Sequence, residues 1–114
     1  MSYPKNLHQH YHAHVYFDEH TSDAAYSLRD YAREELKLSV GRFNRDLVGP
    51  HLSWSFSIDF DAKQFDKVID WLDKNRQEMS VLVHAVTDNE YQDHTDFAYW
   101  LGEPLPLKLS IFDA

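Results

Sequence analysis

A strictly alternating stretch near the start of the chain limits the fold more than any other feature. From residue 10 to residue 17 the sequence reads HYHAHVYF, so one parity is mainly apolar and the other carries His10, His12 and His14. Successive side chains of a β-strand point to opposite faces of the sheet. We therefore expect a strand at 10–17 with an apolar face turned to the core and a histidine-lined face turned away from it.

Similar patterns predict the remaining elements. Alternating or continuous apolar runs predict four more strands, at about 39–44, 52–60, 80–86 and 105–111. Apolar residues at helical spacing predict two helices, at about 21–37 and 61–75. After the fourth strand we expect a polar loop at 88–93 and one or two helical turns at 95–101. Residues 1–9 read as a flexible lead-in.

This order of elements is β-α-β-β-α-β, followed by an added C-terminal helical turn and strand. It predicts an α+β fold, a ferredoxin-like βαββαβ sandwich in which two helices cover one face of the sheet. The strand order expected for such a sheet is 4-1-3-2. With 114 residues, we expect a single domain spanning residues 1–114.

Composition excludes several classes of function. The formal net charge is −8 and no basic patch is visible, which argues against nucleic-acid binding. No run of 18 apolar residues is present, so we expect no membrane span and a cytoplasmic location. Cysteine is absent, so a metal site would have to use nitrogen and oxygen ligands.

Further histidines can reach the histidine-lined face. His51 opens the third strand on its serine-bearing parity, and the third strand is expected beside the first. His84 lies in the fourth strand, whose two faces are both apolar, and His94 follows that strand. Neutral imidazoles are good ligands for Fe(II), Zn or Cu, so a metal site is one reading. Solvated or hydrogen-bonded histidines are the other reading, and we assign it to His8, His10 and His20.

Two other residues are candidates for contact with a substrate. Arg42 has the parity to lie on the open face and could pair with a carboxylate, although a surface salt bridge is the commoner role. Trp100 precedes a turn at Gly102 and could cover the site.

Five motifs occur in an order that resembles the DOPA 4,5-dioxygenase family, in its small fungal and bacterial type. They are YHAHVYF at 11–17, VGPH at 48–51, LVH at 82–84, DHT at 93–95 and WLGEPLPL at 100–107. The similarity extends from about residue 10 to residue 112.

The resemblance implies an extradiol dioxygenase that opens the ring of a catechol such as DOPA, using O2 and non-haem Fe(II). Zinc or another divalent metal could take the place of the iron. The motifs leave open which histidines bind metal and which act on the substrate. We predict His12, His14 and His84 as metal ligands, His51 and His94 as catalytic residues, and Arg42 and Trp100 as substrate-binding residues.

Other readings are compatible with the same fold. One is a metal-binding or small-phenol-binding protein without dioxygenase activity. Another is a cofactor-independent monooxygenase or isomerase of the dimeric α+β barrel type. The partners expected for the dioxygenase are a small aromatic substrate and O2. We also expect a homodimer, with the last strand available as a pairing edge.

Overall fold

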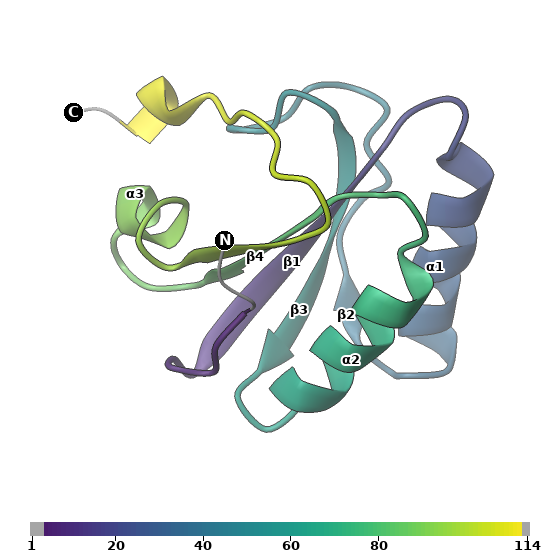
Figure 1. Cartoon of the computed structure of the whole chain (residues 1–114), viewed down its shortest axis with the longest axis horizontal. Helices are drawn as coiled ribbons and strands as arrows, with labels where there is room; N and C mark the ends of the chain where they lie inside the picture. The colour runs from purple at the N-terminus through teal and green to yellow at the C-terminus, as the bar shows by residue number, and fades with distance from the viewer. Residues whose placement is uncertain (1–3, 113–114) are drawn as a thin grey trace.

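The computed structural model describes residues 4–112 and consists of a five-stranded antiparallel sheet with its two long helices on one face (Figure 1). The strands are β1 (His10–Phe17), β2 (Ser39–Val40), β3 (Trp54–Asp61), β4 (Val81–Ala85) and β5 (Ala98–Leu101). The helices are α1 (Ser22–Glu34), α2 (Phe65–Asn75) and the short α3 (Glu90–Asp93), followed by a 3-10 helix, η1 (Leu109–Phe112). Figure 1 shows α1 and α2 on one side of the sheet and α3 on the other.

The α+β ferredoxin-like fold class is confirmed. The strand order is β2-β3-β1-β4-β5, which is the expected 4-1-3-2 order with β5 added beside β4. Strand β1 is therefore central, and it pairs antiparallel with both β3 and β4. Residues on these three strands can meet on one face of the sheet.

The apolar parity of β1 faces the core, as its alternation predicts. Tyr11, Ala13 and Val15 are almost completely buried, and they pack in one cluster with Ile58 of β3 and Leu72 of α2. Side chains of the opposite parity, including His12 and His14, consequently lie on the face away from α1 and α2.

The last third of the chain differs from our predictions. Residues 90–93, predicted as a loop, form α3, which begins where the side chain of Asn89 accepts a hydrogen bond from the Gln92 N–H. Residues 95–101, predicted as helical turns, contain β5 instead, because this segment pairs with β4. The added helical turn and strand thus exist, but both lie earlier in the chain than predicted.

The strand predicted at 105–111 is also wrong. Within that range the structure has one isolated bridge, between His51 and Leu107, and then η1. Pro104 and Pro106 have no backbone N–H, so this stretch cannot donate a regular ladder of hydrogen bonds. The pairing edge that we proposed for a homodimer is therefore absent from residues 105–111, and the homodimer itself stays a prediction.

Helix α2 begins at Phe65, four residues later than predicted, and smaller shifts occur at other boundaries. Helix α1 ends at Glu34, before Lys37, whose positive φ of 57° does not continue a helix. Strand β2 is confined to two residues, although the chain returns to β3 through an isolated bridge between Asn44 and Ser55. Strand β3 begins at Trp54, two residues later than predicted.

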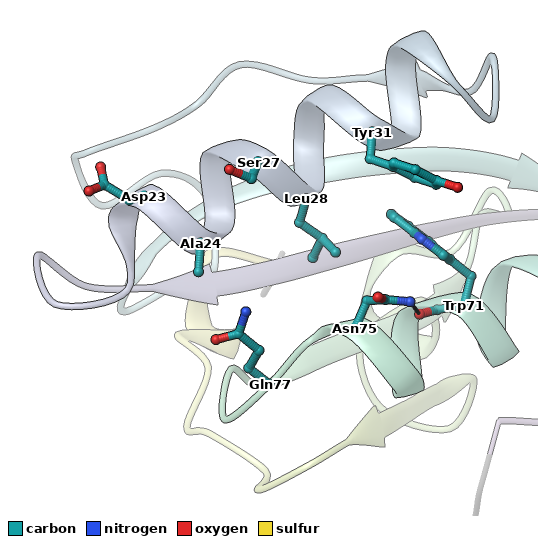
Figure 2. Close-up of a pocket in the computed structure, with 8 residues that line it drawn as sticks. All are labelled: Asp23, Ala24, Ser27, Leu28, Tyr31, Trp71, Asn75 and Gln77. Atoms are coloured by element: carbon teal, nitrogen blue, oxygen red, sulfur yellow. Dashed lines mark hydrogen bonds between the residues drawn. The ribbon is translucent and has the colours of Figure 1, made fainter.

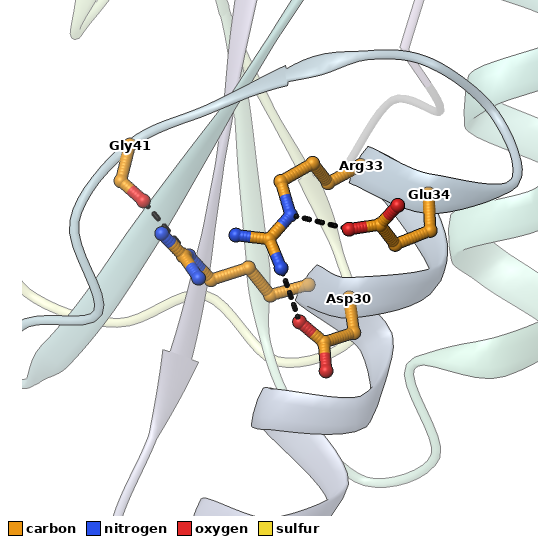
Figure 3. Close-up of polar contacts among 5 residues, drawn as sticks. Asp30, Arg33, Glu34 and Gly41 are labelled. Atoms are coloured by element: carbon orange, nitrogen blue, oxygen red, sulfur yellow. Dashed lines mark hydrogen bonds and ion pairs between the residues drawn. The ribbon is translucent and has the colours of Figure 1, made fainter.

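Polar contacts fasten the segment after α1 to the helix (Figure 3). The guanidinium of Arg29 donates from Nε to the backbone oxygen of Gly41 at 2.9 Å. Arg33 forms ion pairs with Asp30 and Glu34 on the helix surface. The Arg29 contact therefore holds the residue directly after β2 against α1, whereas the ion pairs of Arg33 lie within the helix.

The start of the chain lies against the sheet where it is described. Residues 1–3 of the lead-in that we predicted to be flexible lie outside the described residues. Pro4 is buried, and Asn6 donates a hydrogen bond to the backbone oxygen of Ala62 at 2.9 Å. Among residues 4–112, no helix has the length and apolar character needed to cross a membrane; the cytoplasmic location stays a prediction.

Candidate metal centre

Three histidines from the two neighbouring strands β1 and β4 form the centre of the site. His12 and His84 are directly opposite one another in the β1–β4 register, and His14 follows two residues along β1 on the same face. Each ring offers one nitrogen within 4.8 Å of those of the other two. The Nε2 atoms of His14 and His84 are 2.9 Å apart.

Backbone carbonyls determine which nitrogen of two rings faces the site. Nδ1 of His84 lies 2.7 Å from the oxygen of Ala85, and Nδ1 of His94 lies 2.8 Å from the oxygen of Glu90. A carbonyl only accepts, so Nδ1 carries the hydrogen in both rings. The Nε2 lone pairs of His84 and His94 are thereby left available to a metal ion or to a substrate proton.

A carboxylate supports His12 from β3. Nε2 of His12 lies 3.0 Å from Oδ1 of Asp59, its direct neighbour in the β1–β3 register. Carboxylates in this position orient a metal-ligating imidazole. Asp59 is therefore the carboxylate that contacts a candidate metal ligand.

His51 arrives from the loop before β3. Gly49, with a positive φ of 55°, allows the turn in which the His51 N–H donates to the oxygen of Val48. The ring of His51 lies 4.2 Å from that of His14, measured between centroids. Its Nδ1 is 2.6 Å from the hydroxyl of Tyr16, and the side chain is only 6% exposed.

His94 completes the cluster from the end of α3. Its ring centroid is 4.2 Å from that of His84 and 4.8 Å from that of Phe112 in η1. The loop that carries α3 is held by the buried Asp93, which accepts from both the N–H and the hydroxyl of Thr87. Five histidines from four segments therefore gather in one place.

Burial keeps the centre of this cluster uncharged. It lowers the pKa of His51 to about 4 and that of His84 to about 3, and neighbouring histidines add to both shifts. The pKa of His14 is lowered well below its usual value for the same two reasons, burial first. All three rings are therefore neutral at pH 7. Burial also raises the pKa of Tyr16, so its hydroxyl keeps its proton.

The cluster lies in a pocket of about 380 Å³ on the face opposite α1 and α2. Besides the five histidines, its walls are formed by Gly49, Pro50, Val86, Thr87, Glu90, Asp93, Ile111 and Phe112. Sequence reasoning missed Tyr16 and Phe112. Tyr16 shares the parity of His12 and His14 and could have been found from it, whereas no local pattern places Phe112 beside His94.

The two predicted substrate-binding residues lie outside this pocket. Arg42 is exposed on the segment after β2 and does not line it. Trp100 stacks on Tyr16 with centroids 5.8 Å apart. It therefore supports Tyr16, which contacts His51, and does not itself line the pocket. His10 is exposed at the start of β1, as we expected for a solvated residue.

A larger groove of about 510 Å³ lies between α1 and α2, in the other layer (Figure 2). Its walls include the stacked rings of Tyr31 and Trp71, together with Asn75 and Gln77. None of its lining residues is a histidine. This groove is larger than the histidine pocket, but it lacks the metal-ligating side chains that the histidine pocket has.

The donor set suits a divalent metal ion of the Fe(II) or Zn type. Three imidazoles with converging nitrogens are typical ligands for such ions. Two nitrogens bound at about 2.1 Å and at right angles to each other would lie about 3.0 Å apart, close to the His14–His84 separation. Three protein ligands also leave coordination positions free for other molecules.

Comparison with known proteins identifies relatives of this chain. The model of the Dopa 4,5-dioxygenase family matches residues 11–111. An uncharacterized 21.2 kDa protein of Botryotinia fuckeliana is 36% identical over 110 residues, which cover 86% of this chain and 60% of that protein. A DOPA 4,5-dioxygenase of Amanita muscaria is 33% identical over 109 residues, which cover 88% of this chain and 48% of that protein. The chain thus spans about half the length of these relatives.

A solved structure shows the same fold. It is a crystal structure from Nostoc punctiforme of a protein provisionally assigned as a dioxygenase. The two chains are 35% identical, with a TM-score of 0.85, and the match covers 90% of this chain and 89% of the other. The extent of the family match and the agreement of the folds lead to one conclusion: the chain belongs to the Dopa 4,5-dioxygenase family.

Proposed function

We propose that this chain is an extradiol dioxygenase that cleaves the ring of a catechol such as DOPA, using O2 and non-haem Fe(II) held by His12, His14 and His84. The observation that carries the proposal is the convergence of three imidazole nitrogens in a pocket that two further histidines enter. Family membership supports a dioxygenase.

The metal and the protein would divide the chemistry between them. Bound Fe(II) would supply Lewis acidity toward the catechol oxygens and the redox chemistry that O2 requires. Overall, a ring carbon–carbon bond beside the diol breaks and both atoms of O2 enter the ring-opened semialdehyde. The protein would hold the two reactants together and manage the catechol protons.

His94 and His51 are suited to different parts of the proton transfer. His94 presents Nε2 without a hydrogen, because its Nδ1–H is bonded to Glu90, so it can accept a catechol proton. The position of the hydrogen on the His51 ring is less constrained, because the Tyr16 hydroxyl can either donate to Nδ1 or accept from it. Nε2 of His51 can therefore face the pocket with or without a proton, as a group that returns a proton must.

Apolar walls would limit the access of water to the bound substrate. Pro50 is buried, and Ile111 and Phe112 of η1 lie across the pocket from β4. The ring of Phe112 lies against that of His94 at an angle of 27° between the planes. An aromatic substrate of catechol size could be held between such surfaces.

Oxygen uptake tests the proposed reaction. Protein loaded with Fe(II) without air should consume O2 when DOPA or caffeate is added, and a yellow ring-opened product should form. Chelation of the iron should abolish both signals. The His84→Ala variant should lose them together with bound iron, whereas His20→Ala, at an exposed turn, should retain them.

The competing readings give different results in the same experiment. Absence of uptake with every catechol, in protein shown to contain iron, would contradict the proposal and favour a metal-binding protein. Activity that survives exhaustive chelation would instead favour a cofactor-independent enzyme of this fold.

A further inference from the structure

The histidine pocket contains acidic groups but neither lysine nor arginine. All eleven lysine and arginine residues of the chain fall within the described range 4–112, and none of them lines the pocket. Its charged wall residues, apart from histidine, are Glu90 and Asp93. Asp93 is buried and bonded to Thr87, so Glu90 is the acid that remains accessible.

Arg42 and Lys108, the two basic residues that could supply a positive charge, do not line the pocket. Arg42, which we had expected to bind a carboxylate, is exposed after β2 and is not part of the wall. Lys108 approaches through its backbone alone, where its N–H donates to the oxygen of Pro50 at 2.7 Å; the residue is exposed and does not line the pocket.

Glu90 stands at the rim, next to a proposed catalytic residue. It is exposed, its backbone oxygen accepts the hydrogen bond from Nδ1 of His94, and it lines both this pocket and an adjoining one. A catechol with its oxygens at the histidines would direct its ring substituent toward the exposed wall residues, which are Val86, Glu90 and Ile111. The charge of that substituent is therefore felt by Glu90.

A bound metal would not reverse this preference. The attraction of a divalent ion would act mainly on the catechol oxygens that coordinate it, whereas a substituent at the rim would lie farther from the ion and closer to Glu90. The net charge of −8 adds a field of the same sign as Glu90. A substituent carboxylate would thus meet repulsion at the rim, while an ammonium would meet a partner.

We propose, building on the proposed function, that the site prefers catechols whose substituent carries an ammonium group or no charge, and that Glu90 makes anionic catechols such as caffeate the poorer substrates. With DOPA, the ammonium group is the one recognised and the carboxylate faces solvent. Because Glu90 is exposed, we expect the preference for cationic or neutral catechols over anionic ones to be only about three- to tenfold at low salt. The preference decreases as salt screens the charges.

Three catechols of similar size, which differ in the charge of the ring substituent, test the preference. Dopamine is cationic, 4-ethylcatechol is neutral and 3,4-dihydroxyphenylpropionate is anionic. Dissociation constants would be measured by tryptophan fluorescence on the iron-loaded protein without air, and kcat/KM by oxygen uptake. We expect dopamine and 4-ethylcatechol to have dissociation constants about three- to tenfold lower than that of the anionic compound, and kcat/KM values about three- to tenfold higher.

Two matched variants assign the effect to Glu90. Glu90→Gln should bring the ratio of dopamine to 3,4-dihydroxyphenylpropionate close to one. Glu19→Gln makes the same change in net charge at an exposed turn outside the pocket, and it should leave the ratio as in the parent. An equal loss in both variants would overturn the role of Glu90.

Failure of this inference is distinguishable from failure of the proposed function. Turnover of the anionic compound at least as efficient as that of dopamine would overturn the charge preference and leave a dioxygenase. If Lys108→Ala then removed that turnover, Lys108 would be the missing cation. Selective binding of dopamine without turnover of any catechol would support the charge preference and contradict the dioxygenase.

Discussion

Tyr16 links the site to the sheet, because it contacts both His51 and Trp100. It lies on β1 two residues after His14, is 4% exposed, and places its hydroxyl 2.6 Å from Nδ1 of His51. Trp100 of β5 stacks on its other side. The orientation of His51 thus depends on one hydroxyl group, supported by an aromatic pair.

Removal of that hydroxyl should affect both stability and turnover. In Tyr16→Phe the ring can still stack on Trp100, but the buried Nδ1 of His51 loses its partner. We expect a loss of about 1–3 kcal/mol in the free energy of unfolding, measured with urea. We also expect kcat to fall about 10- to 100-fold with little change in KM, because His51 is no longer held in place.

The exposed Tyr26 offers a matched control for this prediction. Tyr26→Phe removes a hydroxyl from the surface of α1 and should leave stability and turnover as in the parent. Equal effects of the two substitutions, or an unchanged kcat in Tyr16→Phe, would show that the contact with His51 has no part in the reaction.

Side-chain placement at the site was predictable where parity decides it. Alternation predicted that His12 and His14 share the face away from the helices, and the register with β4 brings His84 opposite His12. The roles of these residues stay predictions. The contact between Phe112 and His94 had no local signal, since it joins η1 to α3 across the pocket.

At the scale of elements, the short helix α3 positions His94. Four residues cannot form a stable helix alone, so α3 depends on its surroundings. Asn89 caps its start, and the carboxylate of Asp93 at its end accepts two hydrogen bonds from Thr87. The β4–α3 connection is thereby closed into a loop that holds the next residue, His94, over His84.

Loss of the Asp93 carboxylate should loosen this whole loop. In Asp93→Ala the N–H of Thr87 loses its acceptor, so its hydrogen exchange should become faster, as NMR or mass spectrometry can measure. We expect about 1–3 kcal/mol less stability and a lower kcat, since His94 is no longer fixed. Asp96→Ala, at an exposed position three residues on, should have little effect on either. Unchanged exchange at Thr87 in Asp93→Ala would contradict this account.

The elements predicted well are those whose pattern is local and long. The eight-residue strand β1 and the helices α1 and α2 each show a complete period in the sequence. Strand β5 is only four residues long and exists because Leu82 and Val83 of β4 pair with it. Residues 105–111 alternate like a strand, yet Pro106, together with Pro104 just before them, prevents a ladder. Short elements defined by distant partners are therefore the ones that local patterns miss.

At the scale of the whole molecule, the buried histidines make folding sensitive to acid. In the unfolded chain a histidine has a pKa of about 6.5, whereas in the folded protein burial lowers the pKa of His51 to about 4 and that of His84 to about 3. Between these values the unfolded state binds more protons. Stability is therefore fully present above about pH 6.5 and is lost as the pH falls toward the folded values.

Urea unfolding of the metal-free protein at pH 7, 6 and 5 tests this dependence. By pH 5 each of these two histidines should have cost about 2 kcal/mol of unfolding free energy. His51→Gln should make the profile shallower by about 1.4 kcal/mol per pH unit, because one proton fewer is taken up on unfolding. The slope is the readout, since it does not depend on how much the substitution itself destabilises the protein. His20→Gln, at an exposed turn, should give a profile parallel to the parent. A His51→Gln profile equally parallel to the parent would mean that His51 is not held neutral in the folded protein.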